Sequence, residues 1–258
     1  MTWFRKHLWL PFAYYFSWVL FGLGGLALNI GCVPLLLVPD RERFGRRARR
    51  CTRFMFDLWL RWMHASGVVV VTWKGFDRPL PTGTVYVANH PSLLDAPFLL
   101  ARLPDAVCIF KPALLRNPVI APAALMSGYV SGDQGVDLIR DAATRVAAGQ
   151  SLLIFPEGTR TVQGEVLNPL KPGFALIAQR AESPVQVIRV RSSPLLARKD
   201  HDWWHLPPLP GWVEFTVDEL IPVDRFDNPS ALTQYLAAHL QATLTPPPPD
   251  LRHLSPSS

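Results

Sequence analysis

The sequence predicts an α/β fold in which a mixed sheet is flanked by helices and preceded by an N-terminal apolar helix or helical hairpin. Two observations support this. Residues 8–39 contain no charged side chain. From about residue 68 onward, short β-rich runs bounded by Gly and Pro alternate with helical patterns, which is typical of α/β domains. Because 49% of the chain is hydrophobic and only 18% is charged, a disordered chain is excluded.

The apolar N-terminal run is longer than the roughly 20 residues that cross a bilayer. A dense arginine cluster follows it, which does not fit a cleaved signal peptide. The cluster is Arg41, Arg43, Arg46, Arg47, Arg49, Arg50 and Arg53. If the run crosses the membrane once, the positive-inside rule places this cluster in the cytoplasm.

A re-entrant hairpin with both ends cytoplasmic is an alternative, because basic residues also precede the run and several residues interrupt it. The interrupting residues are Gly24, Gly25, Asn29 and Pro34. A buried core helix of a soluble protein is a further alternative. In both membrane arrangements the rest of the chain faces the cytoplasm, so we expect the protein at an inner or cytoplasmic membrane.

The net charge of +6 is concentrated at one end of the chain. Residues 1–62 hold ten Lys/Arg and three Asp/Glu, whereas residues 63–258 hold sixteen and seventeen. A basic excess beside an apolar segment suits an anionic lipid surface better than a nucleic acid. We therefore expect membrane lipids as partners and no nucleic acid. Apolar residues at helical spacing in 50–66 predict an amphipathic helix, lying either in the membrane interface or packed on the domain.

The rest of the chain predicts three regions. Residues 1–66 would form membrane-anchoring and interfacial helices, 67–245 an α/β domain, and 246–258 a Pro-rich disordered tail. The expected strands are 68–73, 84–88, 107–110, 151–155, 185–191 and 212–220. The expected helices are 50–66, 93–102, 137–148, 174–181 and 229–244. Sites in such folds gather in the loops beyond strand ends.

The first polar loop follows the apolar strand at 84–88 and begins with Asn89 and His90. Asp95 comes five residues after the histidine, in the first turn of the next expected helix. At that spacing its carboxylate can hold one imidazole nitrogen, which leaves the other free to accept a proton. The pattern therefore predicts a general base with an orienting partner. In the alternative, Asp95 only caps the helix together with Ser92.

The second polar loop follows the strand at 151–155 and reads Pro156-Glu157-Gly158-Thr159-Arg160. Gly158 allows a ligand to approach the backbone closely. Arg160 offers a planar fork to a phosphate or carboxylate. Glu157 could accept a hydrogen bond from a substrate hydroxyl; alternatively, Glu157 and Arg160 form a structural pair that shapes the loop.

Together the two loops resemble the glycerolipid acyltransferases of the lysophosphatidic-acid type, whose blocks are NHxxxxD and FPEGTR. Asn89 to Asp95 and Phe155 to Arg160 match these blocks. Lys111 resembles the family's lysine after the next strand, and Lys171-Pro172-Gly173 fits the stretch after the second block. The resemblance covers roughly residues 70–195.

The resemblance implies a transfer of a fatty acyl group from acyl-CoA or acyl-carrier protein to a lysophospholipid such as 1-acylglycerol-3-phosphate. His90 would deprotonate the acceptor and Asp95 would orient the imidazole. The expected substrate-binding residues are Asn89, Lys111, Glu157, Gly158, Thr159 and Arg160. We expect no metal and no cofactor other than the acyl carrier as co-substrate.

Two departures from the family pattern concern the acceptor. Gln134 stands where the family often has an arginine that helps to bind the acceptor phosphate, and Val187 replaces a later proline. One alternative is therefore an acyltransferase that acts on a non-glycerophosphate acceptor, such as a lyso-aminolipid. A non-catalytic membrane adaptor that binds acyl carriers and a hydrolase of acyl thioesters are the alternatives of other classes.

Overall fold

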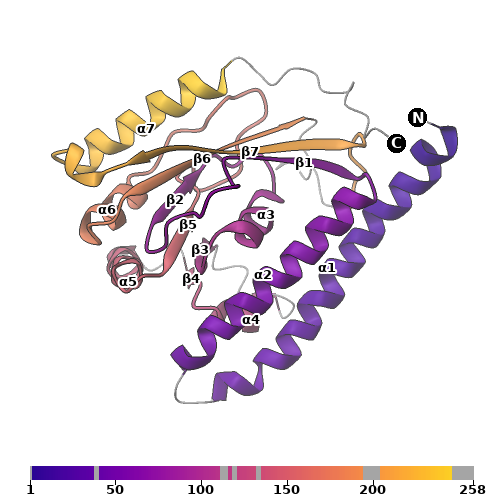
Figure 1. Ribbon diagram of the computed structural model, residues 1–258, viewed down its shortest axis with the longest axis horizontal. Helices are drawn as coiled ribbons and strands as arrows, with labels where there is room; N and C mark the ends of the chain where they lie inside the picture. The colour runs from indigo at the N-terminus through magenta and orange to yellow at the C-terminus, as the bar shows by residue number, and fades with distance from the viewer. Residues whose placement is uncertain are drawn as a thin grey trace.

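The protein is an α/β structure built on one mixed sheet (Figure 1). The computed structural model describes residues 2–37, 41–110, 116–117, 121–131, 135–193 and 204–245. Within them the seven-stranded sheet has the order β1-β7-β6-β2-β5-β3-β4. The strands are β1 (Val69–Lys74), β2 (Val85–Ala88), β3 (Ala106–Phe110), β4 (Val130–Ser131), β5 (Ser151–Ile154), β6 (Val185–Ser193) and β7 (Gly211–Ile221). Only β6 and β7 pair antiparallel, which confirms the expected mixed sheet.

Helices cover both faces of the sheet. They are α1 (Leu10–Cys32), α2 (Arg41–Ala65), α3 (Asp95–Arg102), α4 (Ala121–Met126), α5 (Gly135–Ala147), α6 (Gly173–Arg180) and α7 (Pro229–Leu244). Val85 and Val87 of β2 pack among residues of α5, α6 and α7, whereas Tyr86 and Ala88 pack against α2 and α3. All four residues of β2 are therefore buried, which is why this strand reads as a continuous apolar run.

Helix α2 is longer than the expected helix at 50–66, because it already begins at Arg41. The arginine-rich stretch from Arg41 onward contains no proline and is helical as well. Trp59, Leu60 and Met63 are buried in the core on the sheet. Phe54 and Leu58 remain exposed. The helix is thus packed on the domain and still presents an apolar pair outward.

Helix α1 is continuous through Gly24, Gly25 and Asn29, so the apolar run does not fold back on itself within the helix. Together with the π-helical turn before it (Arg5–Trp9), it is the one helix among the described residues that is long and apolar enough to cross a membrane. Only 22% of the residues in its most apolar stretch are buried, which does not fit a helix in the core of a soluble protein. A short 3₁₀ helix (Pro34–Leu37) follows it.

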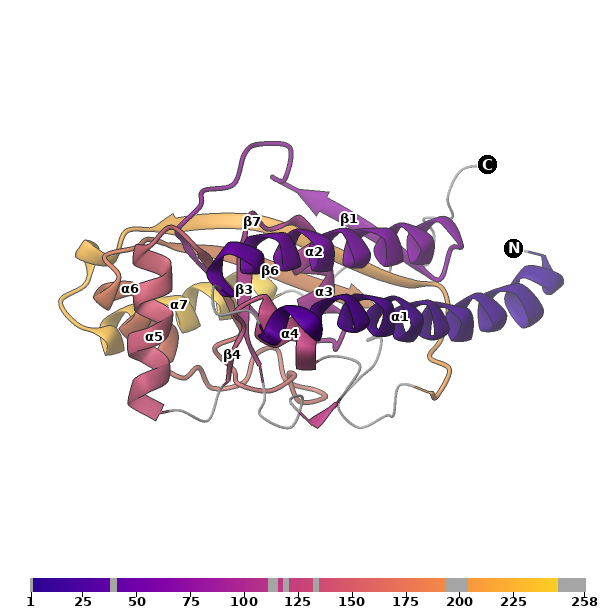
Figure 2. The same cartoon turned by 90° about the horizontal axis from the view of Figure 1, so that it is seen from below.

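The N-terminal segment presents a continuous apolar stripe to the outside, which we call the α1 stripe. Its residues recur every three or four positions, as on one face of a helix. They are Phe4, Leu8, Phe12, Tyr15, Val19, Leu23, Leu26, Ile30, Val33 and Leu37. The opposite face of α1 packs along α2, and the two helices run side by side (Figures 1 and 2).

Polar contacts and one close approach fasten the two N-terminal helices to the rest of the protein. The guanidinium of Arg49 in α2 holds both carboxylate oxygens of Asp105 at 2.7 and 3.0 Å. A Cβ at Gly24 would lie 2.3 Å from Met55 Cε, so any larger residue at this position would require the Met55 side chain to move. Both helices contribute to the core cluster on the sheet. The division into residues 1–66, 67–245 and 246–258 stays a prediction.

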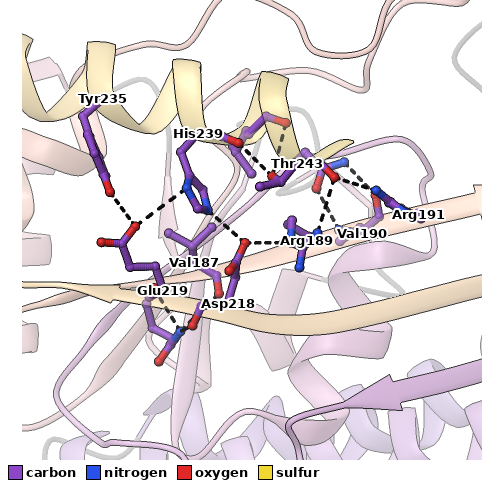
Figure 3. Close-up of polar contacts among 12 residues, drawn as sticks. Val187, Arg189, Val190, Arg191, Asp218, Glu219, Tyr235, His239 and Thr243 are labelled. Carbon is purple, nitrogen blue, oxygen red and sulfur yellow. Dashed lines mark hydrogen bonds and ion pairs between the residues drawn. The ribbon is translucent and has the colours of Figure 1, made fainter. Parts of the chain in front are cut away.

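Helix α7 is held on the sheet by leucines beneath it and by a polar network at its side (Figure 3). His239 Nε2 lies 2.9 Å from Asp218 Oδ2 of β7, which also pairs with Arg189 of β6 at 2.6 Å. The Tyr235 hydroxyl donates to Glu219 Oε2 at 2.7 Å. The network thus ties α7 to the antiparallel pair of strands.

The other expected elements are found with boundaries shifted by at most two residues. The elements α4 and β4 were not expected from the sequence, because at six and two residues they are too short for a clear periodic pattern. The proposed tail at 246–258, Lys111 and Gln134 lie outside the described residues.

Candidate active site

His90 and Asp95 form the expected pair in the loop between β2 and α3. His90 Nδ1 lies 3.0 Å from Asp95 Oδ2. The Asp95 side chain is fully buried, whereas 16% of the His90 side chain is exposed. Because the carboxylate accepts a hydrogen bond from Nδ1–H, the neutral imidazole keeps its Nε2 as a proton acceptor.

The same Asp95 oxygen also accepts a hydrogen bond from the backbone N–H of Ser92 at 2.7 Å. The capping alternative and the catalytic hypothesis are therefore compatible, since one carboxylate shapes the loop and contacts the histidine. The other oxygen, Oδ1, has no hydrogen-bond partner among the described residues. The first helical turn thus fixes the carboxylate whose charge faces the imidazole.

Burial raises the pKa of Asp95 above its ordinary value, because no water solvates its charge. The contact with His90, the N–H of Ser92 and the positive charge of Arg160 act in the opposite direction. A buried carboxylate interacts strongly with a nearby positive charge. A positive charge that develops next to Asp95 during a reaction would therefore interact favourably with the carboxylate.

Phe155, at the end of β5, packs directly on the His90 ring. The two ring centroids are 4.1 Å apart and the planes differ by 21°. Because β2 and β5 are parallel neighbours, their following loops meet at one edge of the sheet. Phe155, the first residue of the second sequence block, therefore supports one face of the His90 ring.

Glu157 holds the backbone of the histidine loop. Its Oε1 accepts from the His90 N–H at 2.7 Å, and its Oε2 accepts from the Asn168 N–H at 2.9 Å. The Thr161 hydroxyl lies within hydrogen-bonding distance of both oxygens, and the Thr161 N–H donates to the His90 carbonyl at 2.8 Å. The N–H and the carbonyl of His90 are thus both bound to the loop that contains the second block. This geometry gives Glu157 a positioning role, and its contact with a substrate stays a prediction.

Asn89 has a comparable role on the other side of the histidine. Its amide donates to the Val190 carbonyl and accepts from the Val190 N–H, both at 2.8 Å. The side chain is buried, so it joins the end of β2 to β6 by two hydrogen bonds. Substrate contact by Asn89 also stays a prediction.

The loop after Glu157 brings cations to the same edge. Gly158 adopts a φ of +67°, a conformation that favours glycine. The Lys171 side chain runs across it, so that a Cβ at this position would lie 2.9 Å from Lys171 Nζ. Thr159 and Arg160 are partly exposed, and Arg160 is close enough to act electrostatically on Asp95.

The structure therefore unites most of the residues expected from the sequence and adds others. Phe155, the first residue of the second block, packs on His90, and Thr161 and Asn168 bind Glu157. No signal in the sequence distinguishes Thr161 and Asn168 from ordinary loop residues. A buried threonine and asparagine in a polar loop are weak indications of such hydrogen bonding.

Comparisons with known proteins place this geometry in a family. Residues 75–191 match the model of a family described as "Acyltransferase". A 1-acyl-sn-glycerol-3-phosphate acyltransferase of Helicobacter pylori is 34% identical over 171 residues, which cover 62% of this chain and 68% of that protein. A chloroplastic 1-acyl-sn-glycerol-3-phosphate acyltransferase of Brassica napus is 37% identical over 172 residues, covering 62% of this chain but 46% of the relative. The chain thus spans about half the length of several curated relatives.

The fold has a match among solved structures. The crystal structure of the 1-acyl-sn-glycerophosphate acyltransferase of Thermotoga maritima superimposes with a TM-score of 0.68. It covers 91% of this chain and 94% of its own, at 21% sequence identity. The same α/β architecture, including most of the N-terminal helices, is therefore present in both proteins. With the sequence matches, these findings show that the chain belongs to the acyltransferase family that includes the 1-acyl-sn-glycerol-3-phosphate acyltransferases.

Proposed function

We propose that the protein transfers a fatty acyl group from acyl-CoA or acyl-carrier protein to the free hydroxyl of 1-acylglycerol-3-phosphate. The observation that carries the proposal is the His90–Asp95 pair, held by the FPEGTR loop at the sheet edge. The named activity of the relatives supports it.

The reaction follows from the position of His90. Its Nε2 takes the proton of the acceptor hydroxyl, and the hydroxyl oxygen attacks the thioester carbonyl carbon. The new C–O bond forms and the C–S bond breaks as the tetrahedral intermediate collapses. The departing thiolate takes the proton from the imidazolium. A positioned general base of this kind contributes roughly 10²–10⁴-fold in rate.

Asp95 stabilises the imidazolium that exists between the two proton transfers, and Glu157 and Asn89 keep the loop in place. Arg160 and Lys171 supply positive charge for the acceptor phosphate, and Lys111 is the further cation that the family pattern suggests. In this arrangement the phosphate positions the glycerol hydroxyl at His90.

The α1 stripe supports membrane association of the enzyme. A lipid acceptor reaches the site from a bilayer, so a helix that presents apolar side chains along its length suits this role. We place the protein at the cytoplasmic face of an inner or cytoplasmic membrane, because the arginines from Arg41 onward follow the apolar helix directly.

The test compares the wild type with His90→Ala in vesicles that contain lysophosphatidic acid, with acyl-CoA and acyl-carrier protein as separate donors. Lipid mass spectrometry should detect phosphatidic acid with the wild type and at least about 10²-fold less with the variant. His239→Ala is the matched control, since His239 lies in the α7 network (Figure 3). Equal turnover by a folded His90→Ala variant would refute the proposal.

A second acceptor class is kept because Gln134 cannot neutralise a phosphate. A lyso-aminolipid or another phosphate-free acceptor would then take the place of lysophosphatidic acid. Supplying both acceptors in the same assay separates the two, since turnover on the phosphate-free lipid alone would assign that class. Free fatty acid released without any acceptor would instead indicate thioester hydrolysis.

A further inference from the structure

The segment before β7 lies beside the N-terminal half of α1, although the two are about 190 residues apart in the sequence. The Tyr15 hydroxyl donates to the Trp204 carbonyl at 3.1 Å, and the Tyr14 hydroxyl lies 3.5 Å from the His205 carbonyl. Figure 2 shows the orange segment before β7 passing α1. Since Tyr15 belongs to the α1 stripe, this segment borders the apolar surface directly.

Large apolar side chains of this segment widen the stripe. Trp204 is 51% exposed and Leu206 is 43% exposed. Trp3 and Phe4, at the start of the chain, are 68% and 61% exposed. Exposed tryptophans beside an apolar surface are typical of side chains that lie at the headgroup level of a bilayer.

A cavity of about 340 Å³ opens between the two segments. One wall is formed by Lys6, His7 and Pro11 and the other by residues 206–209, with sequence Leu-Pro-Pro-Leu. None of the described residues that line the cavity is acidic. Arg5 points elsewhere, because its guanidinium lies against Gly67. Among the described lining residues, Lys6 therefore supplies the full positive charge, opposite an apolar wall.

We propose that this cavity binds the headgroup of an anionic phospholipid at the membrane surface. Lys6 pairs with the headgroup phosphate, residues 206–209 pack against the glycerol and the upper part of the acyl chains, and Trp204 lies in the interface. The commitment to a lipid rests on charge complementarity and on continuity with the α1 stripe. It relies on the membrane association proposed above, but not on acyl transfer.

The site would act as an orienting anchor. The N-terminal end of β7 lies at the same edge of the sheet as the C-terminal ends of β6 and β2, because β7 is antiparallel to β6 and β6 is parallel to β2. Holding this edge against the bilayer presents the histidine loop to lipid. Helix α1 alone would set how deeply the protein lies in the membrane interface. The lipid site adds a second point of attachment beside α1, which orients the protein.

The experiment measures binding of the full-length protein to sedimented vesicles, either of phosphatidylcholine alone or with about one fifth phosphatidylglycerol. One lysine near an anionic surface contributes about 1 kcal/mol, or roughly a fivefold change in partitioning. Lys6→Gln should therefore lose about fivefold on anionic vesicles and change little on neutral ones. Lys74→Gln is the matched control, because Lys74 is exposed at the far end of β1 and pairs with Glu214.

A second variant tests the apolar wall. Leu206→Ser should weaken partitioning several-fold on both kinds of vesicle, with an unchanged melting temperature. The proposal is overturned if Lys6→Gln and wild type partition equally into anionic vesicles, or if Leu206→Ser has no effect. It is also overturned if Lys6→Gln weakens only the binding of acyl-carrier protein, which would assign the cavity to an acidic protein. A folded His90→Ala protein should bind vesicles like the wild type, so this test and the turnover test fail independently.

Discussion

Replacement of Asp95 by asparagine separates the charge of this residue from its shape. One oxygen, Oδ2, accepts from both His90 Nδ1 and the Ser92 N–H. The asparagine carbonyl can occupy that position and keep both hydrogen bonds. Its amino group then takes the place of Oδ1, which has no hydrogen-bond partner among the described residues. Asp95→Asn therefore removes the negative charge with little change in geometry.

The size of the effect follows from the distance. Nδ1 and Oδ2 are 3.0 Å apart, and the two charge centres are roughly 4 Å apart. At an effective dielectric constant of about 20 their attraction is about 4 kcal/mol. Since about 1.4 kcal/mol corresponds to a tenfold change in rate, kcat should fall about 10³-fold. The KM values for donor and acceptor should change less than about threefold, because the imidazolium forms only during the reaction.

The assay is the initial rate of acyl transfer in vesicles, measured beside the melting temperature. Burial raises the pKa of Asp95, which means that the folded protein disfavours its charge. The neutral variant should therefore melt at the same or a higher temperature than the wild type. Asp137→Asn, at an exposed position of α5, is the control. A folded Asp95→Asn variant that keeps more than a tenth of the wild-type kcat would refute the assignment of Asp95 as the partner of the imidazolium.

Three further predictions test the loops around the pair. Glu157→Gln should lower kcat about 10–100-fold. The carboxylate accepts hydrogen bonds from two backbone N–H groups, and the glutamine NH₂ would face one of them donor to donor. Burial raises the pKa of Glu157, so folding favours its protonated form. This preference adds to the free energy of unfolding at pH values below the ordinary pKa of a glutamate. The added free energy is lost as the pH rises through the pKa of the folded protein. Urea titrations should show wild type losing unfolding free energy relative to the variant across that pH window; parallel curves would contradict the direction of the shift. Asn89→Ala should lower the free energy of unfolding by about 2–4 kcal/mol, since it leaves a buried N–H and C=O of β6 unpaired; an unchanged denaturation midpoint would show that water replaces the amide. Gly158→Ala should raise the acceptor KM several-fold by displacing Lys171, whereas Gly149→Ala has a similar positive φ but meets no side chain and should affect stability alone. Equal KM values for the two alanine variants would exclude a role of Lys171 in acceptor binding.

The sequence by itself determined the architecture and the pairing of His90 with Asp95. Buried strands such as β2 are recognisable because both faces of the sheet are covered and every residue is apolar. His90 and Asp95 are five residues apart, so their contact depends mainly on the conformation of one loop. The apolar N-terminal helix follows from composition over more than twenty residues.

Only the tertiary structure decided what the other residues of the two blocks contact. Nothing in the sequence indicated that the side chains of Asn89 and Glu157 contact the backbone of Val190 and of His90, and their contact with a substrate stays a prediction. The approach of Trp204 to Tyr15 could not be read from the chain at all. Periodicity encodes which residues are buried, whereas a polar side chain gives no indication of its partner until distant loops are brought together at the same edge of the sheet.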